Sequence, residues 1–340
     1  MVSARRRARV EEEEASAVVQ EAAEAMCSAG EAIVRDPSAW TSRDGRHPDA
    51  SVIAVVERCA RFDAAAARED AARFARIFRP VGILPPDQYL SIVLQATEGC
   101  SFGTCTFCDL YHDRYRVKSA AEFRQHAEDV RDYLGESVRL RARSIFLGAA
   151  NALAVPMPRL LEFFETARSV FDWSAGSIHA FVDGFTGVRK SADDYARLRE
   201  EGLRRVYVGL ESGDDALLAF VHKPASRDLA VEAVRAIKAG GVSVGVIVMI
   251  GLGGRRFAAG HVGDTTSALN AMGLGPGDIL YFSDLVEAPG TSYPGLAASG
   301  RVEPLSAGER LGQFDAIRAG LAFPGPPPRM ARYDVEEFVY

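Results

Sequence analysis

The chain has 340 residues, of which 48% are hydrophobic and 25% are charged. This is the composition of an ordinary globular protein that can bury a sizeable core in one large domain or two smaller ones. The formal net charge is -6, so a general nucleic-acid-binding surface is not expected. No apolar run reaches the ~18 residues that would span a bilayer, so no membrane segment is expected.

The first residues do not have the pattern of a secretory signal. Basic residues at positions 5–9 are followed by acidic residues at 11–14, with no apolar segment behind them. Cysteines that lie close together in a chain without an export signal are typical of a reducing compartment. We therefore expect the protein to be cytoplasmic.

The amino-terminal part of the chain is predicted to be helical. Residues 11–34 are rich in alanine and glutamate and carry a broken apolar stripe. Asp36 should end this helix, because the residue before a proline avoids the helical region. A second helical block covers residues 52–78, with an interruption near Asp63, and prolines then form a linker.

Two cysteines, Cys27 and Cys59, lie in these helical segments. Both have alanine-rich surroundings. Free cysteine behaves as a small hydrophobic residue and is among the most buried residue types. We therefore expect both to be free, buried thiols.

From residue 90 onward, short apolar runs alternate with helical patterns. The runs predict strands at residues 90–96, 144–148, 177–182, 205–210, 243–250 and 278–285. The helices between them are expected at residues 119–134, 158–171, 191–202, 226–239 and 262–272. Near-continuous apolar strands are typical of parallel sheets covered on both faces, and the alternation favours a parallel α/β fold. The pattern alone suits both an open barrel and a doubly wound sheet.

Three cysteines follow the first predicted strand. Cys100, Cys105 and Cys108 lie within nine residues, spaced Cys-x4-Cys-x2-Cys. Thiols gathered this closely in a reducing compartment bind metal or do redox chemistry more often than they form disulfides. Three thiolates leave one position open on a tetrahedral metal ion, or one iron unligated on a four-iron cluster. The residues alone leave both arrangements open.

Polar residues follow other predicted strands, at the sheet edge where parallel α/β folds bind ligands. The second strand ends at Gly148, and Asn151 follows it. The third strand carries His179 and leads to Asp183, and strand alternation places both on one face with Phe181. We expect Asp183 to contact a substrate and hold it for reaction. For His179, a catalytic contact and a core position are both open.

This combination of features resembles the radical S-adenosylmethionine (SAM) superfamily. That family carries a Cys-x3-Cys-x2-Cys loop after the first barrel strand, with an aromatic residue before the last cysteine, a place that Phe107 fills here. The longer first spacing matches a variant of the branch that resembles coproporphyrinogen oxidases and methylthiotransferases. A tetrad of that branch also appears at the fourth strand, as Gly209-Leu210-Glu211-Ser212.

The resemblance covers residues 80–295 and implies a six-stranded (β/α)6 partial TIM-type barrel. We therefore expect a helical amino-terminal extension at residues 1–85, the barrel at residues 86–290 and a short carboxyl-terminal cap at residues 291–340. The cap should contain one helix near residues 306–320.

The resemblance also implies cofactors and an activity. The three cysteines would hold three irons of a [4Fe-4S] cluster, and the fourth iron would bind SAM. An electron from the cluster would cleave SAM to a 5′-deoxyadenosyl radical, which abstracts hydrogen from an unidentified substrate. The expected partners are a small-molecule substrate and an electron donor such as flavodoxin or ferredoxin.

The residues expected to bind SAM lie mainly at strand ends. By the resemblance, Glu211 accepts hydrogen bonds from the ribose diol, Ser212 lies beside it, and Lys223 pairs with the methionine carboxylate. Gly148 would present backbone groups to the methionine amino group, with Asn151 in place of the usual acidic residue. The remaining expected cofactor contacts are Phe107, Ile250, Gly251 and Tyr281.

Three alternatives stay open. His112 follows Cys108 by four residues and would complete a tetrahedral zinc site in a binding protein. The loop at Gly251 would bind a phosphorylated metabolite in a non-redox barrel enzyme, although it lacks a P-loop pattern. A radical-SAM-like protein could carry a cluster or haem without turnover, because the usual acidic residue near Ala150 is absent. The substrate cannot be identified from the sequence.

Overall fold

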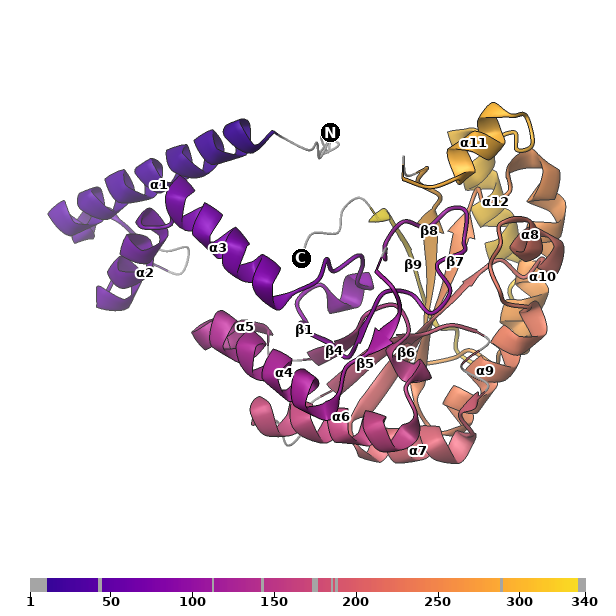
Figure 1. Ribbon diagram of the computed structural model, residues 1–340. Helices are drawn as coiled ribbons and strands as arrows, with labels where there is room; N and C mark the ends of the chain where they lie inside the picture. The colour runs from indigo at the N-terminus through magenta and orange to yellow at the C-terminus, as the bar shows by residue number, and fades with distance from the viewer. Residues whose placement is uncertain are drawn as a thin grey trace. The chain divides into compact units, whose positions relative to one another are not determined.

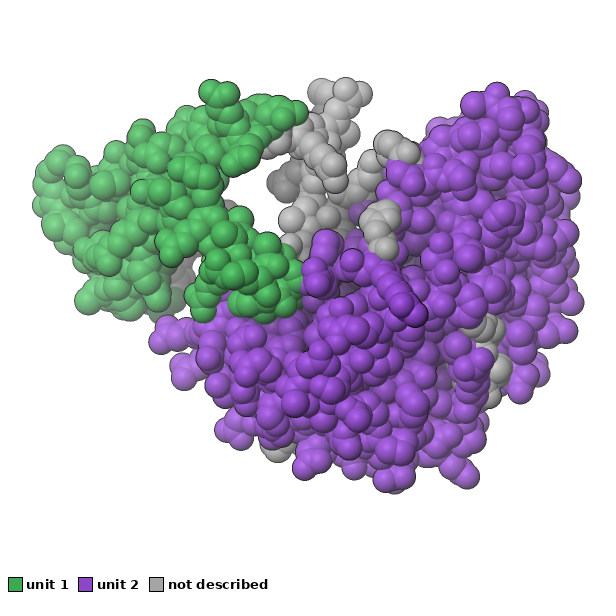
Figure 2. Space-filling model, viewed as in Figure 1, with its two compact units in different colours: residues 1–78 green, residues 79–340 purple. Residues whose placement is uncertain are grey.

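The computed structural model describes residues 11–41, 45–111, 113–141, 144–172, 177–184, 186, 189–287 and 290–335. The chain divides into two compact units, Met1–Phe78 and Arg79–Tyr340, which are coloured separately in Figure 2. None of the described helices has the length and apolar composition that crossing a membrane requires. The domain boundaries expected from the sequence stay predictions.

The described part of the first unit contains three α-helices. They are α1 (Glu12–Arg35), α2 (Ala50–Ala60) and α3 (Ala64–Ile77). The carboxylates of Asp49 and Asp63 each accept two backbone N–H groups at the starts of α2 and α3. Such caps typically stabilise a helix by about 1 kcal/mol, so the interruption expected near Asp63 marks a helix start.

Cys27 and Cys59 are free, but both are exposed. The expectation that they would be buried was wrong. The three helices bury only Ala23, Ile33 and Val56. Their buried stripes are too narrow to enclose the cysteines, which lie on the exposed sides of α1 and α2.

The second unit is built on a seven-stranded sheet with the order β1-β4-β5-β6-β7-β8-β9 (Figure 1). Every neighbouring pair of strands is parallel. The strands are β1 (Ile92–Gln95), β4 (Ser144–Gly148), β5 (Ser177–Val182), β6 (Leu203–Glu211), β7 (Ser243–Ile250), β8 (Ile279–Asp284) and β9 (Arg329–Tyr333). The predicted α/β partial barrel is confirmed, and its first six strands are the six expected ones.

The seventh strand was not expected. β9 comes from the carboxyl-terminal segment and pairs with β8 at the edge of the sheet. Four of its five residues are exposed, and two of them are arginines. An edge strand without an apolar run lacks the pattern by which buried strands are found.

Helices lie along the outside of the sheet in Figure 1. The longer ones are α4 (Ala120–Leu134), α6 (Met157–Val170), α7 (Ala192–Glu200), α9 (Arg227–Ala239), α10 (Gly254–Ala271) and α12 (Ala307–Gly320), and shorter ones are α5 (Val138–Arg141), α8 (Asp215–Phe220) and α11 (Tyr293–Ala298). α10 begins at Gly254 instead of near residue 262. Gly253, with a φ of 77°, turns the chain directly from β7 into this helix.

A partly buried polar network lies toward the amino-terminal end of the sheet. The Asp87 carboxylate accepts hydrogen bonds from the hydroxyl groups of Tyr207 and Tyr281, each at 2.7 Å, and pairs with Arg205 at 2.7 Å. Burial by itself raises the pKa of Asp87, but the hydroxyl donors and the Arg205 charge outweigh it and hold that pKa below its usual value. The carboxylate therefore stays ionised and ties β6 and β8 to the segment before β1.

Asp87→Ala should lower the free energy of unfolding by on the order of 3 kcal/mol, because it removes the acceptor of two hydroxyl groups and a partly buried arginine. The midpoint of urea unfolding measures this change. Asp228→Ala is the control, since it removes a carboxylate that is 88% exposed and should alter stability little. Equal midpoints for the two variants would show that the network does not stabilise the fold.

Candidate functional site

The loop that carries the three cysteines leaves the sheet after β1 and the two-residue strand β2 (Thr97–Glu98), which pairs with β3 (Arg116–Val117). Gly99 has a φ of 68°, and a Cβ at this position would meet the Asp113 carbonyl oxygen at 2.1 Å. Only glycine fits this turn, because it has a positive φ and lies against another backbone segment. The turn brings Cys100 over the carboxyl end of the sheet.

The outer side of the cysteine loop is fixed to α8 and α11. The N–H group of Thr106 donates to the carbonyl oxygen of Val221 at 3.0 Å. The Thr104 hydroxyl donates to the carbonyl oxygen of His222, also at 3.0 Å. The carbonyl oxygen of Thr106 accepts from the N–H group of Tyr293 at 2.9 Å. The loop is therefore held by backbone hydrogen bonds on the side away from its thiols.

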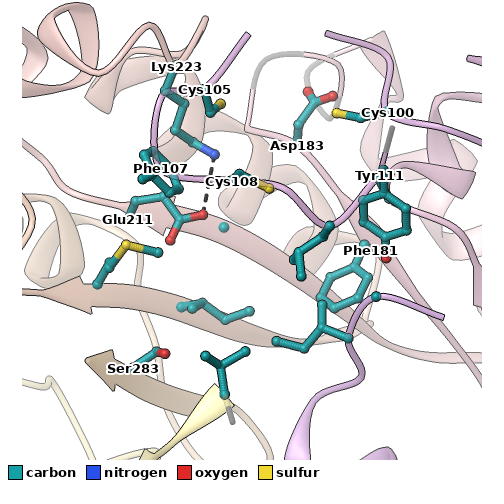
Figure 3. Close-up of a pocket in the computed structure, with 18 of the residues that line it drawn as sticks. Cys100, Cys105, Phe107, Cys108, Tyr111, Phe181, Asp183, Glu211, Lys223 and Ser283 are labelled. Carbon is teal, nitrogen blue, oxygen red and sulfur yellow. Dashed lines mark hydrogen bonds and ion pairs between the residues drawn. The ribbon is translucent and has the colours of Figure 1, made fainter. Parts of the chain in front are cut away.

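A pocket of about 400 Å³ lies at the carboxyl ends of the strands, and all three cysteines line it (Figure 3). Several predicted site residues meet there: Cys100, Cys105, Phe107, Cys108, Asn151, Asp183, Glu211 and Lys223. Figure 3 shows Cys100 and Asp183 on one side of the pocket and Glu211 and Lys223 on the other. Most of the remaining wall is apolar.

Glu211 and Lys223 form an ion pair in the pocket. The Lys223 ammonium nitrogen lies 3.4 Å from a carboxylate oxygen of Glu211, and the two side chains are only 12% and 13% exposed. Burial alone lowers the pKa of Lys223, but the nearby Glu211 charge and the Cys105 sulfur outweigh it and raise that pKa. Lys223 is therefore a permanent cation beside the cysteines.

Burial keeps the thiols of Cys105 and Cys108 protonated while no metal is bound. Burial raises the pKa of Cys105 to about 11; nearby Lys223 opposes the shift, while the neighbouring cysteines and Glu211 add to it. The pKa of Cys108 is also raised, mainly by burial. Both thiols are thus neutral near pH 7 unless a cationic centre displaces their protons, as bound metals do.

The donor set at the pocket suits a four-iron cluster. Among the described residues, no three Cys, His, Asp or Glu side chains converge as ligands of one metal ion. His112, the fourth ligand of the zinc alternative, lies outside the described residues. A four-iron cluster distributes its cysteine ligands over separate irons and needs space between them. Three thiols around one pocket supply that donor set and that space.

Asn151 and Asp183 form a hydrogen-bonded unit in the pocket wall. The Asn151 amide nitrogen donates to the Asp183 carboxylate and, at 3.1 Å, to the Ser101 hydroxyl of the cysteine loop. The backbone N–H and hydroxyl groups of Thr186 donate to the same carboxylate at 2.5 and 2.7 Å. These bonds fix the Asp183 carboxylate in the pocket wall, and its contact with a substrate stays a prediction.

Other predicted site residues do not line this pocket: Gly148, His179, Ser212, Ile250, Gly251 and Tyr281. Tyr281 belongs to the Asp87 network. Gly251 lines a separate cavity of about 240 Å³, and its N–H group donates to Gln313 at 2.7 Å. His179 stays a prediction as a catalytic residue, and the others stay predictions as cofactor contacts.

His179 is 6% exposed and lies deeper in the barrel than the pocket. Its ring is 6.3 Å from that of Tyr207, and Phe181, two residues further along β5, occupies the pocket wall on the same face. Burial, helped by Arg205, lowers the pKa of His179 to about 4. His179 is thus a buried, neutral side chain near pH 7, and its catalytic role stays a prediction.

Two residues of α10 that the sequence analysis missed support the site. The Nδ1 atom of His261 lies 2.7 Å from the Ser212 hydroxyl, and the Thr265 hydroxyl accepts from the N–H group of Gly213 at 2.9 Å. His261, Ser212 and Thr265 are all fully buried. The available signal was their spacing, since polar residues four apart share one helix face.

Residues 94–257 match the family model described as the radical SAM superfamily. The matched segment begins in β1, includes the three cysteines and the Glu211–Lys223 pair, and ends in α10. The segment that carries the site thus matches the radical SAM superfamily, as the sequence resemblance predicted. A comparison with curated proteins found no match.

Similar solved structures are distant. Coproporphyrinogen III oxidase (HemN) from Escherichia coli has 16% identity and a TM-score of 0.45, over 75% of this chain and 55% of that one. Methylornithine synthase (PylB) has 12% identity and a TM-score of 0.47, over 74% of this chain and 73% of that one. The cobalamin-dependent radical SAM enzyme OxsB has 13% identity and a TM-score of 0.44, over 68% of this chain and 31% of that one. The chain thus spans about a third of OxsB and about half of HemN.

His261 should make stability depend on pH. Burial lowers the pKa of His261 from 6.5 to about 4, so below pH 6.5 the unfolded chain binds a proton that the folded chain excludes. The free energy of unfolding therefore has its full value above pH 6.5. It falls as the pH drops toward 4, by about 3 kcal/mol in total. Urea unfolding at several pH values in this window gives the free energy of unfolding as a function of pH. This free energy should change less with pH in His261→Asn than in the exposed control His47→Asn. Identical slopes would contradict the prediction.

Proposed function

We propose that this protein cleaves SAM reductively at a [4Fe-4S] cluster held by Cys100, Cys105 and Cys108 and abstracts hydrogen from a small molecule bound in the same pocket. The observation that carries the proposal is that three thiols and the Glu211–Lys223 pair face one pocket. Both features lie inside the segment that matches the family. A reduced electron-carrier protein, such as flavodoxin or ferredoxin, is the proposed electron source.

The cysteines would hold three irons and leave one for SAM. When bound, the cluster supplies the electron that breaks the sulfonium carbon–sulfur bond of SAM. The protons of the thiols leave on metal binding, and Lys223 stabilises the resulting negative charge near Cys105. The Asn151 bond to Ser101 holds the loop against the strand ends.

Glu211 and Lys223 would orient SAM. The Glu211 carboxylate is suited to accept two hydrogen bonds from a ribose diol, and the Lys223 ammonium to pair with the methionine carboxylate. Their mutual ion pair at 3.4 Å keeps both charges in place before SAM arrives. The apolar wall, which includes Phe107, Phe181 and Met249, would exclude water from the reacting atoms.

The pair also favours turnover over the alternative of a cluster or haem carrier. A protein that only carries a cluster needs the thiols but has no need of a buried carboxylate–ammonium pair beside them. Burying two charges is costly, and the cost is understandable where a zwitterionic ligand uses both. The zinc alternative depends on His112, which lies outside the described residues.

Anaerobic reconstitution tests the cluster assignment. The wild-type protein should bind about four irons and about four sulfides, and form 5′-deoxyadenosine from SAM with dithionite. Cys105→Ser should lose most of the iron and all of the 5′-deoxyadenosine. Cys27→Ser is the matched control, since this exposed thiol lies outside the loop, and it should behave as wild type. One zinc per chain and no sulfide in the wild type would refute the proposal.

Glu211→Gln tests SAM binding separately. The change keeps the shape of the side chain but removes the charge that accepts from the ribose, so the Kd for SAM should rise about tenfold or more. Calorimetry on the reconstituted protein measures this, and the iron content should not change. Glu201→Gln, whose carboxylate pairs with Arg168 on a different part of the barrel, is the control. An unchanged Kd would make Glu211 a structural residue.

A further inference from the structure

Two arginines stack on two phenylalanines at the surface of the second unit. The Arg256 guanidinium lies 5.2 Å from the ring centre of Phe220 and 5.0 Å from that of Phe257. The Arg301 guanidinium lies 5.4 Å from the ring centre of Phe220, and the two rings are 5.0 Å apart. We call these four residues the arginine–aromatic patch. Both arginines are exposed and both rings are half-buried.

The charges of this patch are not neutralised. Among the described residues, no carboxylate lies within ion-pair distance of Arg256 or Arg301, whereas the adjacent Arg255 pairs with Glu303 at 3.0 Å and Glu309 at 2.8 Å. Stacking on a ring holds a guanidinium in place but leaves its positive charge. Two fixed, unpaired cations thus stand on the surface of a chain whose net charge is -6.

The patch is connected to the cysteine loop through one layer of buried side chains. Phe220 and Phe257 pack against a hydrophobic cluster, and Phe107, the residue before Cys108, packs against the same cluster. The members of the cluster are Leu217, Val221, Leu252, Tyr293 and Val302. Val221 and Tyr293 also make the backbone hydrogen bonds that hold Thr106. Figure 1 shows α8, α10 and α11, which supply half of these residues, together at one end of the sheet.

We propose that the arginine–aromatic patch docks a small acidic one-electron carrier protein that reduces the cluster. This inference rests on the proposed function, because only a redox centre at the cysteines requires such a partner. One electron passes from the reduced carrier to the cluster, the carrier is oxidised by one electron, and no bond is made or broken. Arginine and aromatic residues are enriched at the centres of protein interfaces, and unpaired cations steer an acidic partner toward the loop.

A nucleic acid is the other ligand that arginines and aromatic rings can bind, since bases stack on both. The acidic net charge of the chain disfavours that ligand. An acidic protein also agrees better with the position of the patch behind the cysteines, where electron delivery is needed. Binding of a single-stranded oligonucleotide is therefore included as an outcome of the test.

The test compares two electron sources in the reconstituted full-length protein. With reduced flavodoxin as the probe, Arg256→Glu/Arg301→Glu should form 5′-deoxyadenosine on the order of tenfold more slowly than wild type, because steering is lost. With excess dithionite, which needs no docking surface, the two proteins should give equal yields. Arg318→Glu is the matched control: Arg318 also stacks on a ring, that of Phe314 at 5.4 Å, which packs on β8. It should match wild type with both reductants.

The salt dependence gives an independent readout. The flavodoxin-driven rate of the wild type should fall as ionic strength rises, and that of the double variant should be nearly flat. If charge reversal lowers the iron content, Arg256→Gln/Arg301→Gln is the second variant, because it neutralises the two charges without reversing them. It should still slow only the flavodoxin-driven reaction.

Three results would overturn the docking surface while leaving the proposed function intact. The first is that the double variants react with flavodoxin as fast as the wild type. The second is that salt does not change the flavodoxin-driven rate of the wild type, and the third is that the double variants differ from the wild type only in weaker binding of a single-stranded oligonucleotide. Failure of the wild type with dithionite would instead refute the proposed function.

Discussion

The site depends on the backbone turn at the end of β6. Glu211 adopts a φ of 59°, a left-handed conformation that costs a non-glycine residue roughly 1–2 kcal/mol. Buried hydrogen bonds hold this turn: the Ser212 hydroxyl accepts from the N–H group of Asp214 at 3.0 Å and bonds to His261 at 2.7 Å. Because these groups have no access to water, they would be unsatisfied in any other arrangement of the turn. The strain at Glu211 is thereby stabilised, and its carboxylate is directed into the pocket.

The same turn also fixes the position of the cysteines. Asp214 accepts two N–H groups at the start of α8, and the chain beyond α8 supplies both Lys223 and the carbonyl oxygens that hold the cysteine loop. A shift in the turn would therefore move the carboxylate, the ammonium group and the thiols together. Placing these groups on one hydrogen-bonded segment gives the pre-organisation that a site of charged ligands requires.

The sequence predicted the elements with strong local signals. The apolar strands and the cysteine spacing identified the barrel and the loop, and the resemblance led to Glu211 and Lys223, which meet in the pocket. Ser212 stays a prediction as a SAM neighbour, and its hydrogen bond to His261 could not be read from the sequence, because the two residues lie 49 positions apart. Tyr333 lines the pocket from β9, an exposed strand without a recognisable pattern. Residues placed by a long-range contact have no local signature to read.

The cysteine loop separates two environments that radical chemistry needs to keep apart. Its inner side faces an apolar pocket, in which a reactive carbon centre would be protected from water. Its outer side is covered by the hydrophobic cluster that carries Phe220 and Phe257, with unpaired arginines beyond it. An electron can cross a packed layer of side chains, whereas water and bulky molecules cannot. If the proposed carrier docks at the arginine–aromatic patch, electrons and substrate would reach the site from different sides of the loop.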